Sequence, residues 1–479
     1  MSPLSPRWRV GRSSEAVTVG WPAHRSGVER LHASYAAIPP GAQVRLAKRT
    51  SNLFRPRDSA DSGLDVSGLG GVIEVDPENR TAEVAGMCTY ERLVDATLPH
   101  GLIPLVVPQL RTITLGGAVT GLGIESTSFR NGLPHESVLE MDVLTGDGQI
   151  VTATPDGPHR HLFAGFANSY GSLGYAVRLK IELEPIASVV SLRHLRFTDL
   201  DEAMGSLGEI VEAGSHEGVR VDGLDGVMFA PDHVVLTLAT WGAEPGFPVM
   251  RPSDYTGQQI YYRSLQERDT DLLTAYDYLW RWDTDWFWCS RAFGAQHPVV
   301  RRVWPRRWRR SDVYHRLVGW DRRYGIADRL DARAGRPLRE RVIQDVELPL
   351  DRVAEFLGWF DQEIAMSPVW LCPLRVRASA DPGVRPWPIY PLEAGVTYVN
   401  VGFWGTVAVG PDAPEGPRNR AIEQQVSELG GHKSLYSEAF YDRETFDTLY
   451  NGAELARLKD RYDPDGRLVS LYDKAVRNR

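Results

Sequence analysis

Cysteine is scarce in this sequence. Only Cys88, Cys289 and Cys372 occur among 479 residues, far apart and without a CxxC pair or a histidine-rich neighbour. Metal sites and disulfide frameworks rest on closely spaced ligand or cysteine patterns. We therefore expect three reduced thiols and no bound metal.

Long apolar runs and net positive charge are also missing. No stretch approaches the 18 or so uninterrupted apolar residues that a membrane-spanning helix needs, and residues 1–21 lack the apolar centre of a secretory signal. The formal net charge is -8, whereas nucleic-acid binding normally requires a basic face. The sequence predicts a cytoplasmic protein with no nucleic-acid partner, whose membrane contact, if it has any, is peripheral and at the inner face.

The chain is too long for one compact domain, so two or three folding units are expected. Up to residue 185, short apolar runs separated by turn residues predict a strand-rich α+β unit with strands at 71–75, 81–84 and 137–144, and helices at 90–100 and 158–166. Beyond it the pattern predicts a helix at 199–213, a hairpin around residues 231–232, a helix at 350–364 between two strands, and a helical segment at 438–479.

Glycine is concentrated between residues 108 and 147, in PQLRTITLGGAVTGLGIESTSFRNGLPHESVLEMDVLTGD. Loops without Cβ atoms let a backbone approach an anion and point several N-H groups at a pyrophosphate. The spacing is neither GxGxxG nor a P-loop, and ordinary turns in a β-rich unit are the alternative. Three further segments accompany it: a cationic, hydroxyl-rich turn at 44–52, a glycine-flanked turn and strand at 168–183, and LKDRYDPDG at 458–466.

The order of these four segments resembles the vanillyl-alcohol-oxidase (PCMH-type) FAD-binding fold, in which two α+β subdomains enclose the flavin and a cap domain covers its ring. GGAVTGLGIESTSFRNG, VWLCPLR, TYVNVGFWG and KSLYSEAFYDRETF are similar to the delta-24 sterol reductase branch, which includes bacterial flavoproteins that reduce methylene-branched fatty acyl chains. The resemblance extends over roughly residues 44–476. It implies an N-terminal segment (1–42), an FAD-binding domain (43–186), an α+β cap or substrate domain (187–430) and a C-terminal helical segment (431–479) that returns to the flavin.

The resemblance also implies which residues contact FAD. The first loop contains no histidine, so we expect the cofactor to be non-covalent. For any one of these positions a purely structural turn is the alternative. The implied contacts are Lys48, Arg49, Thr50, Ser51, Thr114, Gly116, Gly117, Gly121, Gly123, Ile124, Glu125, Ser126, Gly171, Gly174, Ala176, Lys459 and Tyr462.

Tryptophan and arginine gather in residues 276–310, where the resemblance places the cap. We expect an apolar substrate pocket lined by Trp280, Trp282, Trp286 and Trp288, although a large aromatic core is the plain alternative. Six arginines interleave with Trp304 and Trp308, a pairing suited to an anionic bilayer surface or to a solvated basic face. These arginines are Arg301, Arg302, Arg306, Arg307, Arg309 and Arg310.

An isolated carbon-carbon double bond limits the mechanism, because without a neighbouring carbonyl nothing stabilises the carbanion that hydride addition would create. Protonation first, followed by hydride capture, is the easier order, and it needs a proton donor in a water-poor pocket. We predict Tyr278 and Asp283 as catalytic donors, although an ion pair with Arg281 or Arg291 would make the aspartate structural. Other candidates are Asp285, His315, Glu438 and Tyr441.

The sequence thus predicts an FAD-dependent reductase of an unactivated double bond in a lipid, with NADPH or NADH visiting the flavin transiently. A phospholipid-bound, methylene-branched acyl chain reduced to the methyl-branched chain is the favoured substrate. A methyltransferase that makes the methylene group would then be a partner. A sterol, a flavin oxidase or dehydrogenase of an alcohol or polyprenyl-linked sugar, and a lipid-binding protein without flavin are the alternatives.

Overall fold

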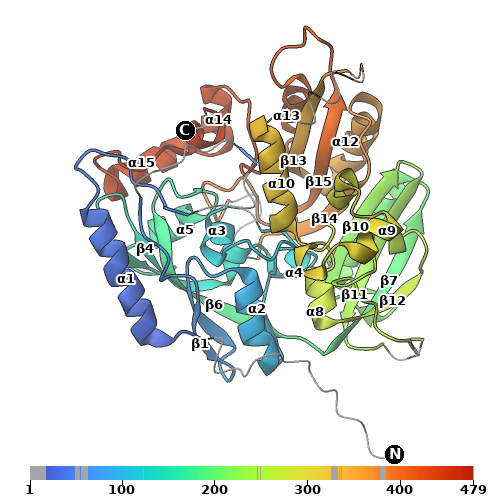
Figure 1. Ribbon diagram of the computed structural model, residues 1–479, viewed down its shortest axis with the longest axis horizontal. Coiled ribbons are helices and arrows are strands. Elements are labelled where there is room, and N and C mark those ends of the chain that lie inside the picture. Colours follow the sequence, from blue (N-terminus) through green and yellow to red (C-terminus); the bar gives the residue numbers. More distant parts are fainter. Residues whose placement is uncertain are drawn as a thin grey trace, which may run out of the picture.

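A computed structural model describes residues 18–48, 54–55, 63–121, 123–244, 246–248, 250–324, 329, 333, 335, 337–377 and 385–477, without the side chains of 322–324. Two antiparallel sheets organise the chain (Figure 1). All strands of the first sheet precede residue 186 and all strands of the second follow residue 188. The predicted boundary between the FAD-binding and cap domains therefore lies between the sheets.

The first sheet has the order β1-β2-β6-β4-β5, with β3 also paired to β6. Its strands are β1 (Val72–Asp76), β2 (Thr81–Ala85), β3 (Leu102–Pro104), β4 (Val138–Leu144), β5 (Ile150–Ala153) and β6 (Tyr175–Pro185). Around it lie helices α1 (Gly20–Ala36), α2 (Tyr90–Thr97), α3 (Leu115–Thr120), α4 (Ser128–Asn131) and α5 (Arg160–Phe166). The central strand β6 joins the halves of this unit, because it pairs with β2 on one side and with β4 on the other.

The second sheet has the order β12-β7-β11-β10-β14-β15-β13-β16. Its strands are β7 (Val189–Phe197), β10 (Gly223–Ala230), β11 (His233–Trp241), β12 (Thr270–Thr274), β13 (Arg339–Pro349), β14 (Val369–Arg375), β15 (Thr397–Ala408) and β16 (His432–Lys433). One face packs against α6 (Leu200–Ala213), α12 (Leu350–Glu363) and α13 (Pro417–Glu428), whose apolar side chains share one core with Val342, Val346 and Val401. The opposite face joins the core of the first unit.

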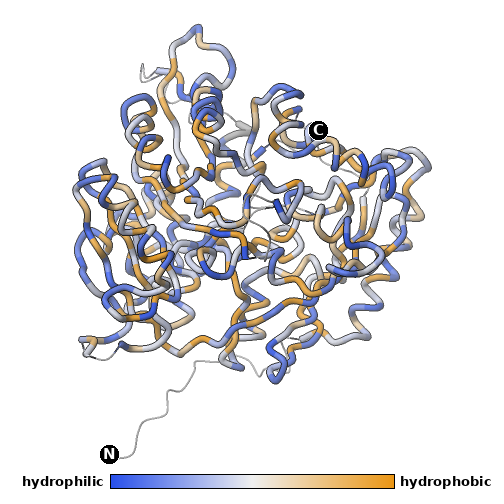
Figure 2. Tube along the Cα trace, turned by 180° about the vertical axis from the view of Figure 1, so that it is seen from behind, coloured by the Kyte–Doolittle hydropathy of each residue, from blue (hydrophilic) through white to orange (hydrophobic). Residues whose placement is uncertain are grey.

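The tryptophan-rich region between β12 and β13 consists of short helices and turns: α8 (Ala275–Trp280), η4 (Cys289–Phe293), α9 (Pro298–Val303), η5 (Arg306–Trp308) and α10 (Ser311–Tyr324). The last helices are α14 (Arg443–Leu449), α15 (Gly452–Tyr462) and α16 (Leu471–Ala475); α15 contacts α5 of the first unit, and α14 contacts α15 (Figure 1). Figure 2 shows apolar stretches on the interior strands and hydrophilic stretches on the outer loops and helices. In the part of the chain that the structure describes, no helix is both long and apolar enough to cross a membrane.

The predicted α+β class is confirmed, and local signals located most elements. Asp199 caps α6 by accepting from the Glu202 amide, as an aspartate before a helix should. The predicted hairpin is β10-β11. The expected helix at 90–100 differs: α2 ends at Thr97 and a 3-10 turn follows, because Pro99 lacks the amide hydrogen that would continue an α-helix.

Candidate active site

One cavity of about 660 Å³ lies between the two units. This volume is within the range of pockets that hold small ligands and cofactors. The first unit contributes the turn that ends at Lys48, the loop 108–117 and the turn 170–176; the second contributes strands β13, β14 and β15. Residues 286–287 and the C-terminal segment complete the wall.

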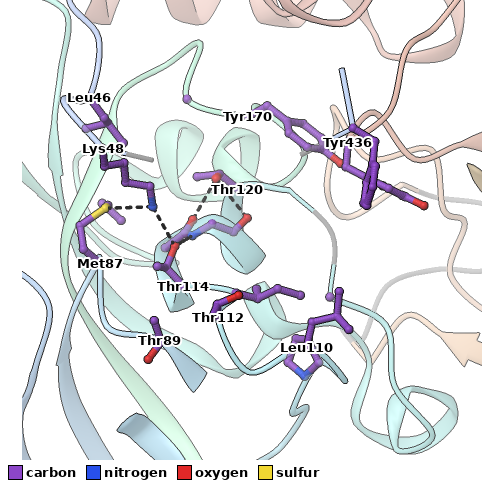
Figure 3. A pocket seen from close by; sticks show the side chains of 18 of the residues that line it. Leu46, Lys48, Met87, Thr89, Leu110, Thr112, Thr114, Thr120, Tyr170 and Tyr436 are labelled. Atoms are coloured by element: carbon purple, nitrogen blue, oxygen red, sulfur yellow. Dashed lines mark hydrogen bonds between the residues drawn. The ribbon is translucent and has the colours of Figure 1, made fainter. Parts of the chain in front are cut away.

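One end of the cavity is cationic and rich in hydroxyl groups. The Lys48 Nζ atom lies 3.4 Å from Thr114 Oγ1 and 3.4 Å from Met87 Sδ (Figure 3). Arg45, Arg55 and Lys474 also line the cavity, which gives it four cationic side chains, and Arg55 among them lies toward Tyr436, because its Nε donates to the Leu435 carbonyl at 3.2 Å. Such a set can balance the charge of a pyrophosphate.

The glycine-rich turn before α3 is packed against the first sheet. A Cβ atom at Gly116 would lie 2.6 Å from the Gly86 carbonyl oxygen, so only glycine fits there. We expected this loop to point several amides at an anion. The Leu115 amide instead donates to Cys88 O at 2.8 Å and the Gly116 amide to Gly86 O at 2.9 Å. Side-chain cations and hydroxyls are therefore the main groups available to a phosphate.

The other end of the cavity is aromatic. Trp286, Phe287, Trp370, Trp404 and Tyr436 line it, and the Phe287 and Trp404 rings lie 4.3 Å apart. Figure 3 shows Tyr436 on the side of the cavity away from Lys48. Trp286 and Phe287 both have positive φ angles, 47° and 58°. Bulky residues seldom adopt this strained conformation, which concentrates at functional sites.

In the part of the chain that the structure describes, one carboxyl group lies on this aromatic wall. Among the described residues that line the cavity, Asp345 is the only acid, and none is a histidine or cysteine. Asn400 Nδ2 donates to Asp345 Oδ1 at 2.9 Å, and the Tyr436 hydroxyl is its second partner. Burial raises the pKa of Asp345 to about 6, although these hydrogen bonds oppose the rise.

The predicted FAD contacts divide into three groups. Those on the cavity wall are Lys48, Thr114, Gly116, Gly117, Gly123, Ile124, Gly171, Gly174 and Ala176. Arg49, Thr50 and Ser51 lie outside the described residues. Gly121, Glu125, Ser126, Lys459 and Tyr462 lie elsewhere in the structure. The residues of the first group lie where they can touch a bound ligand directly. Their contact with FAD stays a prediction.

Glu125 and Ser126 belong to a buried ionic cluster instead of the wall. Arg281 Nη2 lies 2.8 Å from Glu125 Oε1 and 3.0 Å from Asp225 Oδ2. The hydroxyls of Ser126 and Tyr278 are 2.6 Å apart, and the Arg281 guanidinium lies 4.1 Å from the centre of the Tyr278 ring. This arrangement places the predicted donor Tyr278 in the buried cluster and away from the cavity wall, and its catalytic role stays a prediction.

Asp283, the other predicted donor, is also held in a buried ion pair. Its carboxylate accepts from the Arg111 backbone amide at 3.0 Å, from Arg111 Nε at 3.2 Å and from Ser311 Oγ at 2.6 Å. The partner of Asp283 is thus Arg111, and not Arg281 or Arg291 as the sequence suggested. Burial raises the pKa of Asp283, but the side chain does not reach the cavity wall.

Of the four predicted pocket tryptophans, the structure brings only Trp286 to the described cavity. Trp280 and Trp282 are fully buried, and the Trp282 indole donates to Asp225 at 3.1 Å. Trp288 lies behind Phe287, with ring centres 5.9 Å apart. The region thus acts mostly as an aromatic core, as the alternative interpretation allowed.

The C-terminal segment reaches the cavity through other residues than those predicted. Lys459 Nζ donates to the Ser172 carbonyl at 3.2 Å, and Tyr462 OH lies 2.9 Å from His159 Nδ1, so both contacts attach the segment to the first unit. Val469 and Lys474 line the cavity in their place.

Sequence reasoning missed Asp345, Trp370, Asn400, Trp404 and Tyr436 as wall residues, although alternation along VWLCPLR and TYVNVGFWG could have indicated three of them.

Comparison with known proteins supports the flavin assignment. Residues 39–154 match a family model described as FAD binding domain. The chain is 24% identical to a Delta(24)-sterol reductase of Arabidopsis thaliana over 445 residues, which covers 87% of this chain and 77% of that protein. It is 23% identical to a human Delta(24)-sterol reductase over 420 residues, with coverage of 85% and 76%.

A shorter match involves cytokinin dehydrogenase 10 of Oryza sativa subsp. japonica, which is 30% identical over 144 residues, 29% of this chain and 26% of that protein. The cavity fits the cofactor that the domain match implies, because it joins four cationic side chains to an aromatic end in one space. The chain is an FAD-dependent oxidoreductase with a PCMH-type FAD-binding domain, and it is similar to Delta(24)-sterol reductases along most of its length.

Proposed function

We propose that this protein reduces an unactivated carbon-carbon double bond in a lipid, using FAD and a nicotinamide electron donor. The observation that carries the proposal is the continuity of a cationic end and an apolar, aromatic end within one cavity. The first suits a dinucleotide phosphate and the second an isoprenoid or acyl chain. Similarity to proteins named Delta(24)-sterol reductase favours reduction of a double bond over oxidation of an alcohol.

Lys48, Arg45 and Lys474 would hold the FAD phosphates, and Thr114 would add a hydroxyl. FAD, when bound and reduced, supplies a hydride. The lining offers no histidine or cysteine in the described residues, and residues 49–62 contain neither. This supports non-covalent binding. The rings of Trp286, Phe287 and Trp404 exclude water from the reacting end, and their faces stabilise positive charge that develops on the substrate.

For the substrate, a methylene-branched acyl chain of a phospholipid is our first candidate and a sterol side chain the second. The names of the relatives favour the sterol. A surface segment favours the phospholipid: Val299, Val303 and Trp308 are exposed by 66%, 74% and 49%, and the exposed Arg302 and Arg307 lie beside them in sequence. An apolar, basic surface of this kind suits an anionic bilayer.

Not all arginines of this segment can serve such a surface. Arg301 is buried and its guanidinium lies 2.7 Å from Asp285. Arg309 is buried as well and donates to the Gly257 carbonyl at 2.6 Å. We propose that these two anchor the segment while its exposed residues contact the membrane. Co-sedimentation with anionic vesicles that is unchanged in Trp308→Ala plus Arg307→Ala would remove this part of the proposal.

The function is tested anaerobically with the purified protein. We expect NADPH or NADH to bleach the flavin absorbance, and a methylene-branched phospholipid or a delta-24 unsaturated sterol to restore it. Which of the two lipids restores it identifies the substrate class. Bleaching by an alcohol but not by nicotinamides would make the protein an oxidase or dehydrogenase. A colourless protein that cannot be reconstituted with FAD would point to a lipid-binding role.

A further inference from the structure

We infer that Asp345 is the proton donor to the substrate double bond. The inference rests on the proposed reductase function and assigns a catalytic residue to it. Asp345 lies on β13, in the middle of the second sheet, and its side chain faces the cavity. It is the only carboxylic acid among the described residues of the wall, whereas Tyr278 and Asp283 are engaged in buried networks away from it.

The sheet makes room for this carboxyl group and holds it in place. Gly402 of β15 stands directly opposite Asp345, and a Cβ atom there would lie 2.5 Å from Asp345 Oδ1. Asn400 donates to the same oxygen. The Trp404 indole donates to the Tyr436 hydroxyl at 3.0 Å, and Tyr436 in turn is hydrogen-bonded to Asp345. A side chain with this support keeps one orientation toward the cavity.

The surroundings make Asp345 easier to protonate than an exposed aspartate. Among the described residues, the groups whose pKa Asp345 affects are acids, a thiol and phenols, and burial raises the pKa of each: Glu347, Cys372, Tyr170, Tyr390 and Tyr436. No cation is among the causes that set the pKa of Asp345 itself, which is about 6. A lipid that fills the aromatic end removes more water and raises this pKa further.

The chemistry balances with this assignment. The proton leaves an Asp345 carboxyl oxygen and bonds to the less substituted alkene carbon through the π electron pair, which leaves a tertiary carbocation and a carboxylate. FAD, when bound and reduced, would supply the hydride for the second C-H bond and would be left oxidised. The aromatic faces of Trp286 and Trp404 stabilise the cation while it exists. The carboxylate regains a proton from solvent before the next turnover.

Asp345→Asn tests the inference, because asparagine keeps the shape and cannot protonate the alkene. We expect the variant to bind FAD and to be bleached by nicotinamide like the unaltered protein. Reoxidation by the lipid should slow by about 10²- to 10⁴-fold, the usual contribution of a general acid. Asp412→Asn, at an exposed loop position, is the matched control and should reoxidise normally.

A second readout needs no turnover. Infrared difference spectra of the apo-protein, recorded across pH, should contain a protonated-carboxyl band that titrates near pH 6 and is missing in Asp345→Asn. If the variant reoxidises at the unaltered rate, Asp345 is not the donor although the reductase function stands. If no lipid alkene reoxidises the unaltered protein, the reductase proposal fails and the donor role fails with it, whatever the infrared result.

Discussion

The buried carboxyl group of Asp345 should make the stability of the protein depend on pH in a particular direction. Burial raises its pKa from the ordinary 3.8 to about 6. Between these values the folded protein holds a proton that the unfolded chain releases, so the stabilisation is complete below pH 3.8 and is lost as the pH rises through about 6. The difference between the two values corresponds to roughly 3 kcal/mol of unfolding free energy.

Replacing Asp345 with asparagine removes this penalty. The free energy of unfolding of Asp345→Asn, relative to the unaltered apo-protein, should rise by up to about 3 kcal/mol between pH 4 and pH 7 and then level off. An altered hydrogen bond to Tyr436 would shift the whole curve by about 1 kcal/mol without changing its slope. Urea titrations at each pH measure the difference, with Asp412→Asn as the control for the loss of one exposed carboxylate. A difference that is flat, or that falls as pH rises, would refute the reasoning.

Four further substitutions test other parts of the structure. Lys48→Ala should weaken FAD binding by about tenfold or more, since a charged hydrogen bond contributes about 1.5–3 kcal/mol; a titration of flavin fluorescence that gives unchanged affinity would exclude the contact. Arg281→Leu should cost about 3–5 kcal/mol of unfolding free energy, because two buried carboxylates lose their partner, and an unaltered denaturation midpoint would contradict this. Gly174→Ala should destabilise the fold by more than about 1 kcal/mol, because φ is +140° and the new Cβ would lie 2.5 Å from a carbonyl oxygen. Gly205→Ala, on an exposed face of α6 with no atom near the new methyl group, should stabilise it by about 0.5–1 kcal/mol in the same assay.

Elements defined by local signals could be predicted from the sequence. Asp199 identifies the start of α6, and Pro231 with Asp232 identifies the turn of the β10-β11 hairpin. Gly101 ends the 3-10 turn after α2 with φ 69°, as expected of a glycine in that position. Each signal involves atoms a few residues apart, and such interactions depend little on the rest of the fold. The loop around Thr114 was located for the same reason.

The acid on the cavity wall could not be predicted in this way. Asp345 lies in VIQDVELP, which gives no sign of which strand faces it or what covers it. Its partners, Asn400 and Tyr436, are distant in sequence and meet it only through pairing of β13 with β15 and β16. Tyr278 and Asp283 were predicted because they lie among the tryptophans in sequence, whereas Arg281 and Arg111 contact them in the interior, away from the cavity wall.

The two faces of the second sheet explain how one strand serves both stability and chemistry. On β13, Val342 and Val346 pack into the helix-covered core, while Asp345 points the other way, toward the cavity. Side chains alternate along a strand, so burial of the valines fixes the direction of the acid without any local strain. The cationic groups come mainly from turns of the first unit and the C-terminal segment, and the acid comes from a sheet that packs against α6, α12 and α13. Loops can bind a flexible cofactor, whereas proton transfer to a carbon requires the rigid placement that the sheet provides.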